Sequence, residues 1–117
     1  MLIKTSEIKP GIVVLEMSGR VQMGNDCKRI EKEVDDHVAR KEKFMIFDLT
    51  AVDHIDSAVV GQIVKSHSVL SRSGGALRLA GPHGMVESVL KMTQVDKVIP
   101  VYPTLLAASQ DFPAPTT

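Results

Sequence analysis

The side chains best suited to chemistry gather in one short segment, A-V-D-H-I-D-S-A-V-V-G, which covers residues 51–61. The segment follows an apolar run and precedes a helical pattern, so Ser57 is expected at the carboxyl end of a strand and near the start of a helix. Functional groups of open α/β sheets gather at this end of the strands. The unpaired N–H groups and the positive dipole end of a helix N-terminus also favour a phosphoryl group.

Two interpretations of Ser57 are open from the residues alone. A phosphoryl group on its hydroxyl would lie beside Asp53 and Asp56, whose negative charges would repel it. Phosphorylation would then change the local surface strongly. The simpler interpretation is that Asp56 or Ser57 caps the helix, since Asp and Ser are common N-caps. The spacing by itself favours the capping role.

An enzymatic role is not predicted. Ser57, His54 and Asp53 have the residue types of a serine triad, but triads are assembled from separated positions, and these three are crowded together. No G-x-S-x-G elbow surrounds the serine. The histidines show no H-x-x-x-H pairing, so each is expected at the surface or at a boundary without a metal. They are His37, His54, His67 and His83. We therefore expect no catalytic residue, no metal site and no cofactor.

Composition narrows the class of protein. The 117 residues suit one domain, and 14 Lys plus Arg balance 14 Asp plus Glu, so the basic surface of a nucleic-acid binder is not expected. No apolar stretch approaches the roughly 20 residues that cross a bilayer. Charges near the N-terminus argue against a secretory signal. The single Cys27 allows no disulfide within the chain and fits a reducing compartment. A cytoplasmic protein without membrane or nucleic-acid partners is expected.

Hydrophobic periodicity predicts an α/β fold. The predicted strands cover residues 2–7, 12–17, 44–49, 76–80 and 98–102, with Ser18 and Gly19 ending the second and Pro100 placing the last at a sheet edge. The predicted helices cover residues 25–40, 57–73 and 83–92, and Thr104 caps a final helical segment. This order predicts one domain, residues 1–111, with a mixed four- to five-stranded sheet and about four helices. Residues 112–117 are expected to form a disordered tail.

Two helix ends can be predicted in more detail. Asn25 or Asp26 is the expected N-cap of the first helix, whose inward stripe recurs at three- and four-residue spacing. That stripe consists of Cys27, Ile30, Val34 and Val38. Gly74 and Gly75 are the expected terminator of the second helix.

Four segments, taken in order along almost the whole chain, resemble a known family. They are S-G-R-V at residues 18–21, F-D-L-T-A-V-D-H-I-D-S at 47–57, G-G-A-L-R-L-A-G at 74–81 and V-L-K-M-T-Q-V-D-K-V-I-P-V-Y at 89–102. Each segment is a loose match, and together they are fairly specific. The family is the STAS domain, and the resemblance is to its anti-sigma factor antagonists.

The resemblance implies a protein-binding switch in bacterial transcription. In the antagonists, the serine after the signature aspartate is phosphorylated by a partner that is both anti-sigma factor and serine kinase, and that position is Ser57 here. The unphosphorylated form binds this partner, the phosphorylated form does not, and a serine phosphatase resets the switch. The residues expected to contact the partner are Arg20, Asp53, His54, Asp56, Ser57, Ala58 and Gly61.

The sequence departs from the family motif after the serine. The usual D-S-[ST]-G-L-G is D-S-A-V-V-G here, with Ala58 and Val59 replacing a hydroxyl residue and a glycine, so the first helical turn is bulkier and less flexible. The alternatives that stay open are an unphosphorylated STAS scaffold or interaction module, associated with a stressosome or a transporter, and a nucleotide-binding STAS domain. A weak homodimer is also left open.

Overall fold

The computed structural model describes residues 1–113. Its five strands form one mixed sheet in chain order: β1 (Leu2–Lys9), β2 (Ile12–Val21), β3 (Phe44–Ile55), β4 (Ala76–Ala80) and β5 (Val101–Tyr102). β1 is antiparallel to β2, and all later neighbours are parallel. The helices are α1 (Asn25–Ala39), α2 (Ser57–Arg72), α3 (Gly84–Met92) and α4 (Leu105–Ser109). The predicted fold class, a mixed sheet with about four helices, is confirmed.

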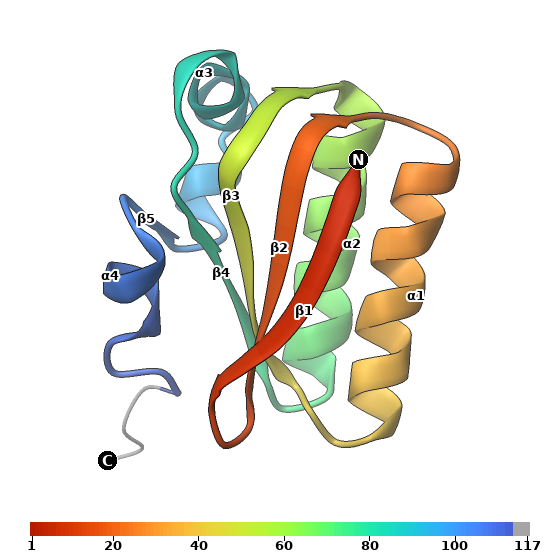
Figure 1. The fold of residues 1–117 in the computed structure, drawn as a ribbon, viewed down its shortest axis with the longest axis vertical. Coiled ribbons are helices and arrows are strands. Elements are labelled where there is room, and N and C mark those ends of the chain that lie inside the picture. The colour runs from red at the N-terminus through yellow and green to blue at the C-terminus, as the bar shows by residue number, and fades with distance from the viewer. Residues whose placement is uncertain (114–117) are drawn as a thin grey trace.

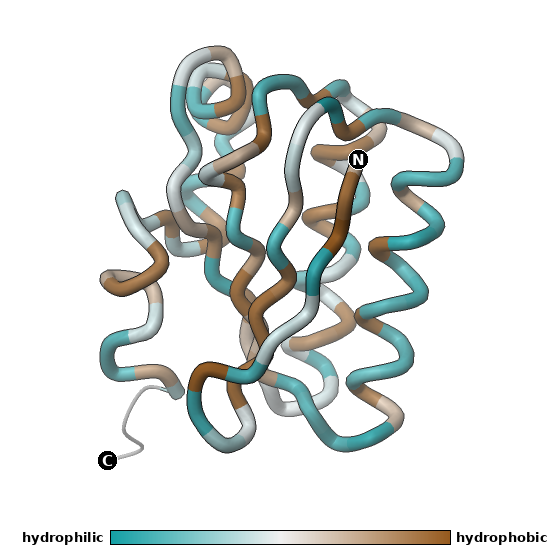
Figure 2. The backbone as a smooth tube through the Cα atoms, in the orientation of Figure 1, coloured by the Kyte–Doolittle hydropathy of each residue, from teal (hydrophilic) through white to brown (hydrophobic). Residues whose placement is uncertain are grey.

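Helices cover both faces of the central strands. α1 and α2 lie against one face, and α4 lies on the other side of the sheet (Figure 1). Alternate residues of β2 therefore enter two cores: Val13, Leu15 and Met17 face the α1–α2 side, whereas Ile12 and Val14 join a smaller cluster that includes residues of α4. Figure 2 shows the result, with hydrophobic segments along the inner strands and a mostly hydrophilic α1. Such two-sided burial explains why β2 and β3 read as continuous apolar runs.

Three strands are longer than predicted, and the first of them, β1, runs to Lys9 and not to residue 7. The predicted stop at Ser18 and Gly19 is wrong, because β2 continues to Val21 through register shifts that flank this pair. Gly19 has a φ of +79°, a conformation that glycine adopts readily and that occurs in β-bulges. β3 likewise runs past Leu49 to Ile55. Residues 18–21 pair with residues 51–55, so each extension supports the other.

Of the two helix ends predicted in detail, the start of α1 differs from the prediction and the end of α2 agrees with it. The predicted N-cap of α1 at Asn25 or Asp26 is wrong: α1 follows Gly24, and the Asp26 carboxylate instead accepts a hydrogen bond from the backbone N–H of Gln22 at 3.0 Å. The predicted terminator of α2 is confirmed. Gly74 N–H donates to Ser71 and Gly75 N–H donates to Leu70, which is the hydrogen-bond pattern of a Schellman motif.

The C-terminal region differs from prediction at two points. The last strand is shorter than residues 98–102, because Val95–Lys97 forms a 3₁₀ turn and only Val101 and Tyr102 pair with β4. β5 does lie at the sheet edge, and Thr104 Oγ1 caps α4 by accepting from Ala107 N–H.

The predicted start of a disordered tail at residue 112 is also wrong. Phe112 is only 5% exposed; its ring lies edge-on to that of Phe44, and the Arg78 guanidinium is 4.2 Å from its centroid. The rest of the predicted tail, residues 114–117, lies outside the described residues.

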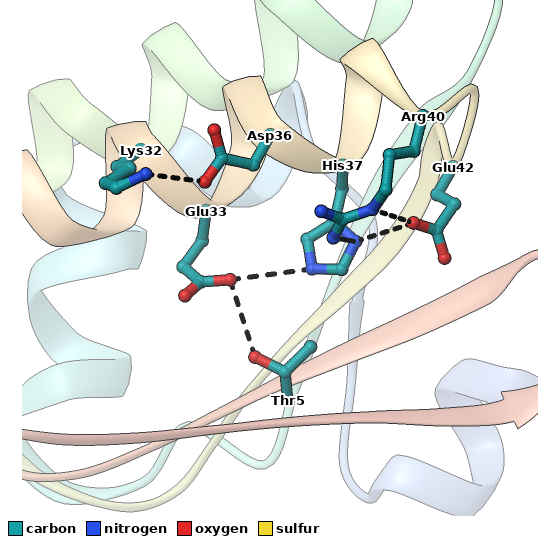
Figure 3. A network of polar contacts seen from close by, with 7 residues as sticks. All are labelled: Thr5, Lys32, Glu33, Asp36, His37, Arg40 and Glu42. Atoms are coloured by element: carbon teal, nitrogen blue, oxygen red, sulfur yellow. Dashed lines mark hydrogen bonds and ion pairs between the residues drawn. The ribbon is translucent and has the colours of Figure 1, made fainter.

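His37 is a buried histidine, not the surface or boundary residue that was predicted. It is 6% exposed and lies near the end of α1 (Figure 3). Its Nε2 is 3.5 Å from Glu33 Oε2 and its Nδ1 is 3.2 Å from Glu42 Oε1, so both ring nitrogens have carboxylate partners. Arg40 also contacts Glu42, at 2.8 Å. Position 37 is one turn beyond Val34 and therefore falls in the inward stripe of α1, where these polar partners permit a histidine.

Candidate functional site

Ser57 is the first residue of α2 and follows the carboxyl end of β3 by two positions. Its side chain is exposed, and within the described residues its hydroxyl has no hydrogen-bond partner. The expected position at the junction of a central strand and a helix is therefore correct. Because β3 continues beyond the predicted strand end at residue 49, Asp53 and His54 lie on a strand.

The N-cap of α2 is Asp56 and not Ser57. Its Oδ1 accepts a hydrogen bond from the backbone N–H of Val59 at 3.0 Å, the usual geometry of an aspartate N-cap. Ser57 is thus free of the capping role and presents its hydroxyl to solvent beside the cap.

The second oxygen of Asp56 ties the site to another part of the chain. Asp56 Oδ2 accepts from the backbone N–H of Met23 at 2.9 Å, across 33 positions of sequence. Met23 lies between β2 and α1, and its side chain is 71% exposed. The sequence analysis did not predict this contact between the Met23 backbone and Asp56. The feature of the sequence that could have pointed to Met23 is an apolar side chain in the polar linker directly after a buried strand.

The electrostatics of this junction favour an ionised Asp56. Partial burial opposes the charge, but backbone hydrogen bonds from Met23, Val59 and Ala58 outweigh it and hold the pKa of the Asp56 carboxyl below its usual range. Burial raises the pKa of the neighbouring Cys27 thiol, and the negative charge of Asp56 raises it further. The cap therefore carries a fixed negative charge next to Ser57 at neutral pH.

The outward face of the first half of α2 is built from small residues. Ser57, Ala58 and Gly61 are exposed, and a Cβ added to Gly61 would meet no atom within 4 Å. Val59 is instead turned into the core, with 1% exposure. The substitutions at positions 58 and 59 thus act in different places: Val59 adds volume inside the protein, whereas Ala58 leaves the exposed face of the helix without a large side chain. A partner backbone can approach such a surface closely.

The other predicted contact residues lie on the neighbouring strand ends. Arg20 is exposed and is the register partner of the half-buried His54 across the β2–β3 ladder, while Asp53 is exposed. Asp53, His54 and Ser57 show no mutual hydrogen bond among the described residues. Their arrangement therefore does not form a serine triad in this structure.

Within residues 1–113, no group of three or more His, Cys, Asp or Glu side chains is arranged to hold a metal ion. None of the helices in this part of the chain has the length and apolar character needed to cross a membrane.

Comparison with known proteins identifies the family. The model of the STAS domain matches residues 4–108. A Thermotoga maritima protein named "Putative anti-sigma factor antagonist" is 31% identical over 106 residues, which cover 90% of this chain and 93% of that protein. The chain belongs to the STAS domain family. Within it, the chain is similar to proteins described as anti-sigma factor antagonists, as the motif resemblance predicted.

Solved structures agree with this assignment. The crystal structure titled as a putative anti-sigma factor antagonist from Thermotoga maritima superposes with a TM-score of 0.84 at 26% identity, covering 93% of this chain and 92% of the other. The Bacillus cell fate determinant SpoIIAA, solved in its phosphorylated form, gives a TM-score of 0.69 at 14% identity and covers 86% and 90%. The likeness to SpoIIAA shows the fold alone.

Proposed function

We propose that this protein is a cytoplasmic anti-sigma factor antagonist of bacterial transcription and acts as a binding switch without enzymatic activity. The surface around Ser57 binds an anti-sigma factor that is also a serine kinase. Phosphorylation of Ser57 by this partner ends the binding, and a serine phosphatase restores it. The proposed contact residues are Arg20, Asp53, His54, Asp56, Ser57, Ala58 and Gly61.

One observation carries the proposal. Ser57 is exposed and follows a helix cap that is already provided by Asp56, so its hydroxyl is free for modification without loss of the cap. If Ser57 were the cap, its hydroxyl would be engaged with the backbone and less accessible to a kinase. The division of roles between two adjacent residues leaves the second one available to a kinase.

A phosphate at Ser57 would change the charge of the surface more than its shape. It would add a charge of about −1.5 to −2 at neutral pH. This charge would stand beside Asp56, which hydrogen bonds already hold in the ionised state. Helix N–H groups and the dipole would lower the energy of the phosphate, but a partner surface complementary to a single carboxylate would meet two negative groups. Binding would be lost through repulsion.

The experiment combines phosphosite mapping with binding by charge variants. Protein isolated from its native cells is expected to carry phosphate on Ser57, and the unphosphorylated protein is expected to capture the kinase in a pull-down. Ser57→Ala should bind that partner like the wild type, whereas Ser57→Asp should bind at least tenfold more weakly. Ser71→Asp is the matched control, because Ser71 is exposed on the last turn of α2, roughly 20 Å from Ser57 along the helix axis.

The proposal fails if no growth or stress condition yields phosphate on Ser57 and if Ser57→Asp and Ser57→Ala bind the captured partner equally. That result would assign the chain to the unmodified interaction modules of the family. A large effect of Ser71→Asp equal to that of Ser57→Asp would likewise contradict a switch located at the start of α2.

A further inference from the structure

The outer edge of the sheet at β1 has no partner among the described residues. β1 is eight residues long and pairs only with β2, so half of its backbone N–H and C=O groups point away from the sheet. In Figure 1, β1 lies in front of the other strands, and no helix is drawn across its outer edge. Its side chains are exposed except for the half-buried Ile3.

The opposite edge of the sheet is protected in ways that β1 is not. β5 has only two residues, with Pro100 directly before it and Pro103 directly after it, and proline cannot donate a ladder hydrogen bond. β1 contains no proline, and residues 2–7 pair with β2 without a bulge. A long regular edge of this kind is a ready template for another strand.

We propose that two copies of this chain associate through antiparallel pairing of β1 with β1, which joins their sheets into one ten-stranded sheet. A second copy suits this edge because the same strand supplies both sides of a two-fold contact. The chain has no net charge, so two copies approach each other without overall repulsion. This interface is separate from the Ser57 surface and does not depend on the proposed switch.

The side-chain charges of β1 and the extent of its regular pairing determine which residues of the two β1 strands lie opposite each other. The register shift between Glu7 and Lys9 limits regular pairing to residues 2–7. A two-fold axis at Lys4 would place the two Lys4 side chains directly opposite each other, which is destabilising. An axis at Thr5 instead places Thr5 opposite Thr5 and Lys4 opposite Ser6 of the other copy. Threonine pairs are favourable across strands, and the Thr5 hydroxyl has only a long, exposed hydrogen bond to Glu33 Oε2, at 3.5 Å, that would compete with such a pair (Figure 3), so the axis is assigned to Thr5.

The contact is narrow, so the dimer depends on concentration. A single strand edge is smaller than the roughly 1,600 Å² interface of a typical stable complex. Analytical ultracentrifugation of the wild type should therefore show a monomer at low concentration and a growing dimer fraction as the concentration rises. Thr5→Lys should abolish the dimer, because two lysines would then face each other at the axis. Thr5→Ser is the matched control and should retain the dimer.

Disulfide trapping tests the register directly, in a Cys27→Ser background. Thr5→Cys should yield a covalent dimer on mild oxidation, since directly opposite Cα atoms about 4.5–5.5 Å apart can be bridged. Ser6→Cys should not, because the two Ser6 residues would be diagonal neighbours about 7–8 Å apart. A wild type that stays monomeric at millimolar concentration would overturn the proposal. So would a dimer that survives Thr5→Lys, or efficient trapping of Ser6→Cys in place of Thr5→Cys, with circular dichroism confirming that each variant is folded.

Discussion

The Asp56 carboxylate holds the backbone of Met23 against the start of α2, with Oδ2 2.9 Å from the Met23 nitrogen. Its other oxygen caps the helix through Val59 at 3.0 Å. One side chain thus fixes both the first turn of α2 and the linker that leads from β2 to α1. Because Ser57 is the next residue, any change in the charge around Asp56 reaches both segments of the candidate surface.

Removal of the Asp56 carboxylate should destabilise the protein, whereas removal of the Ser57 hydroxyl should not. Asp56→Ala loses the N-cap and the Met23 contact, and we expect it to cost about 1–2 kcal/mol of unfolding free energy in urea or thermal denaturation. Ser57→Ala should change stability by less than about 0.5 kcal/mol, because the hydroxyl makes no contact that the substitution breaks. The reverse order of effects would show that Ser57 is the cap.

Stability should fall in acid partly through Asp56. Its pKa is lower in the folded protein than in the unfolded chain, so its stabilising contribution is complete above the unfolded value of about 3.9 and is lost as pH falls through the folded value. Asp56→Asn keeps a capping oxygen but cannot titrate. The difference in unfolding free energy between wild type and Asp56→Asn should therefore shrink below about pH 4. Parallel stability curves from pH 7 to pH 2 would contradict this assignment.

Side chains added at Gly61 should separate folding from partner binding. The position is helical, and a Cβ there has open space, so Gly61→Ala should stabilise the protein by about 0.5–1 kcal/mol. Gly61→Gln should fold equally well yet reduce capture of the partner from native-cell extract, because the longer side chain would project from the exposed face of α2 that otherwise carries only small residues. Equal capture by Gly61→Gln and wild type would place the contact surface elsewhere.

His37→Ala should destabilise the protein. The substitution removes a buried side chain and leaves Glu33 and Glu42 without their shared partner, for an expected loss of about 1–3 kcal/mol measured by chemical denaturation. The matched control is Lys32→Ala, which breaks only the exposed ion pair with Asp36. Exposed pairs contribute little, so this control should leave the denaturation midpoint unchanged.

Local sequence was sufficient to place the candidate site at a strand–helix junction. Asp56 and Ser57 lie between an apolar run and a helical pattern, and capping preferences depend on residues within one turn. The same local logic located the Gly74–Gly75 terminator and the Thr104 cap. The choice between Asp56 and Ser57 as cap was not local in this sense, because both residue types are suitable.

Tertiary pairing decided the features that prediction missed. β2 and β3 extend to Val21 and Ile55 because their ends pair with each other in parallel. The predicted strand ends, at Ser18–Gly19 and at Leu49, rested on neighbouring residues alone and could not include this pairing. Their parallel course also brings Met23 to Asp56.

Contacts between distant parts of the chain also explain why the burial of His37 and of Phe112 was not predicted. His37 can be buried because two carboxylates contact its ring nitrogens, Glu33 from within α1 and Glu42 from beyond the end of the helix. Phe112 has a fixed place because its ring packs against that of Phe44 and against the Arg78 guanidinium. The sequence by itself determined which short segments turn, cap and alternate, since those preferences arise within a few residues. Only the tertiary structure decided strand length, burial of polar groups and the contact between Asp56 and Met23, because these depend on residues brought together from distant parts of the chain.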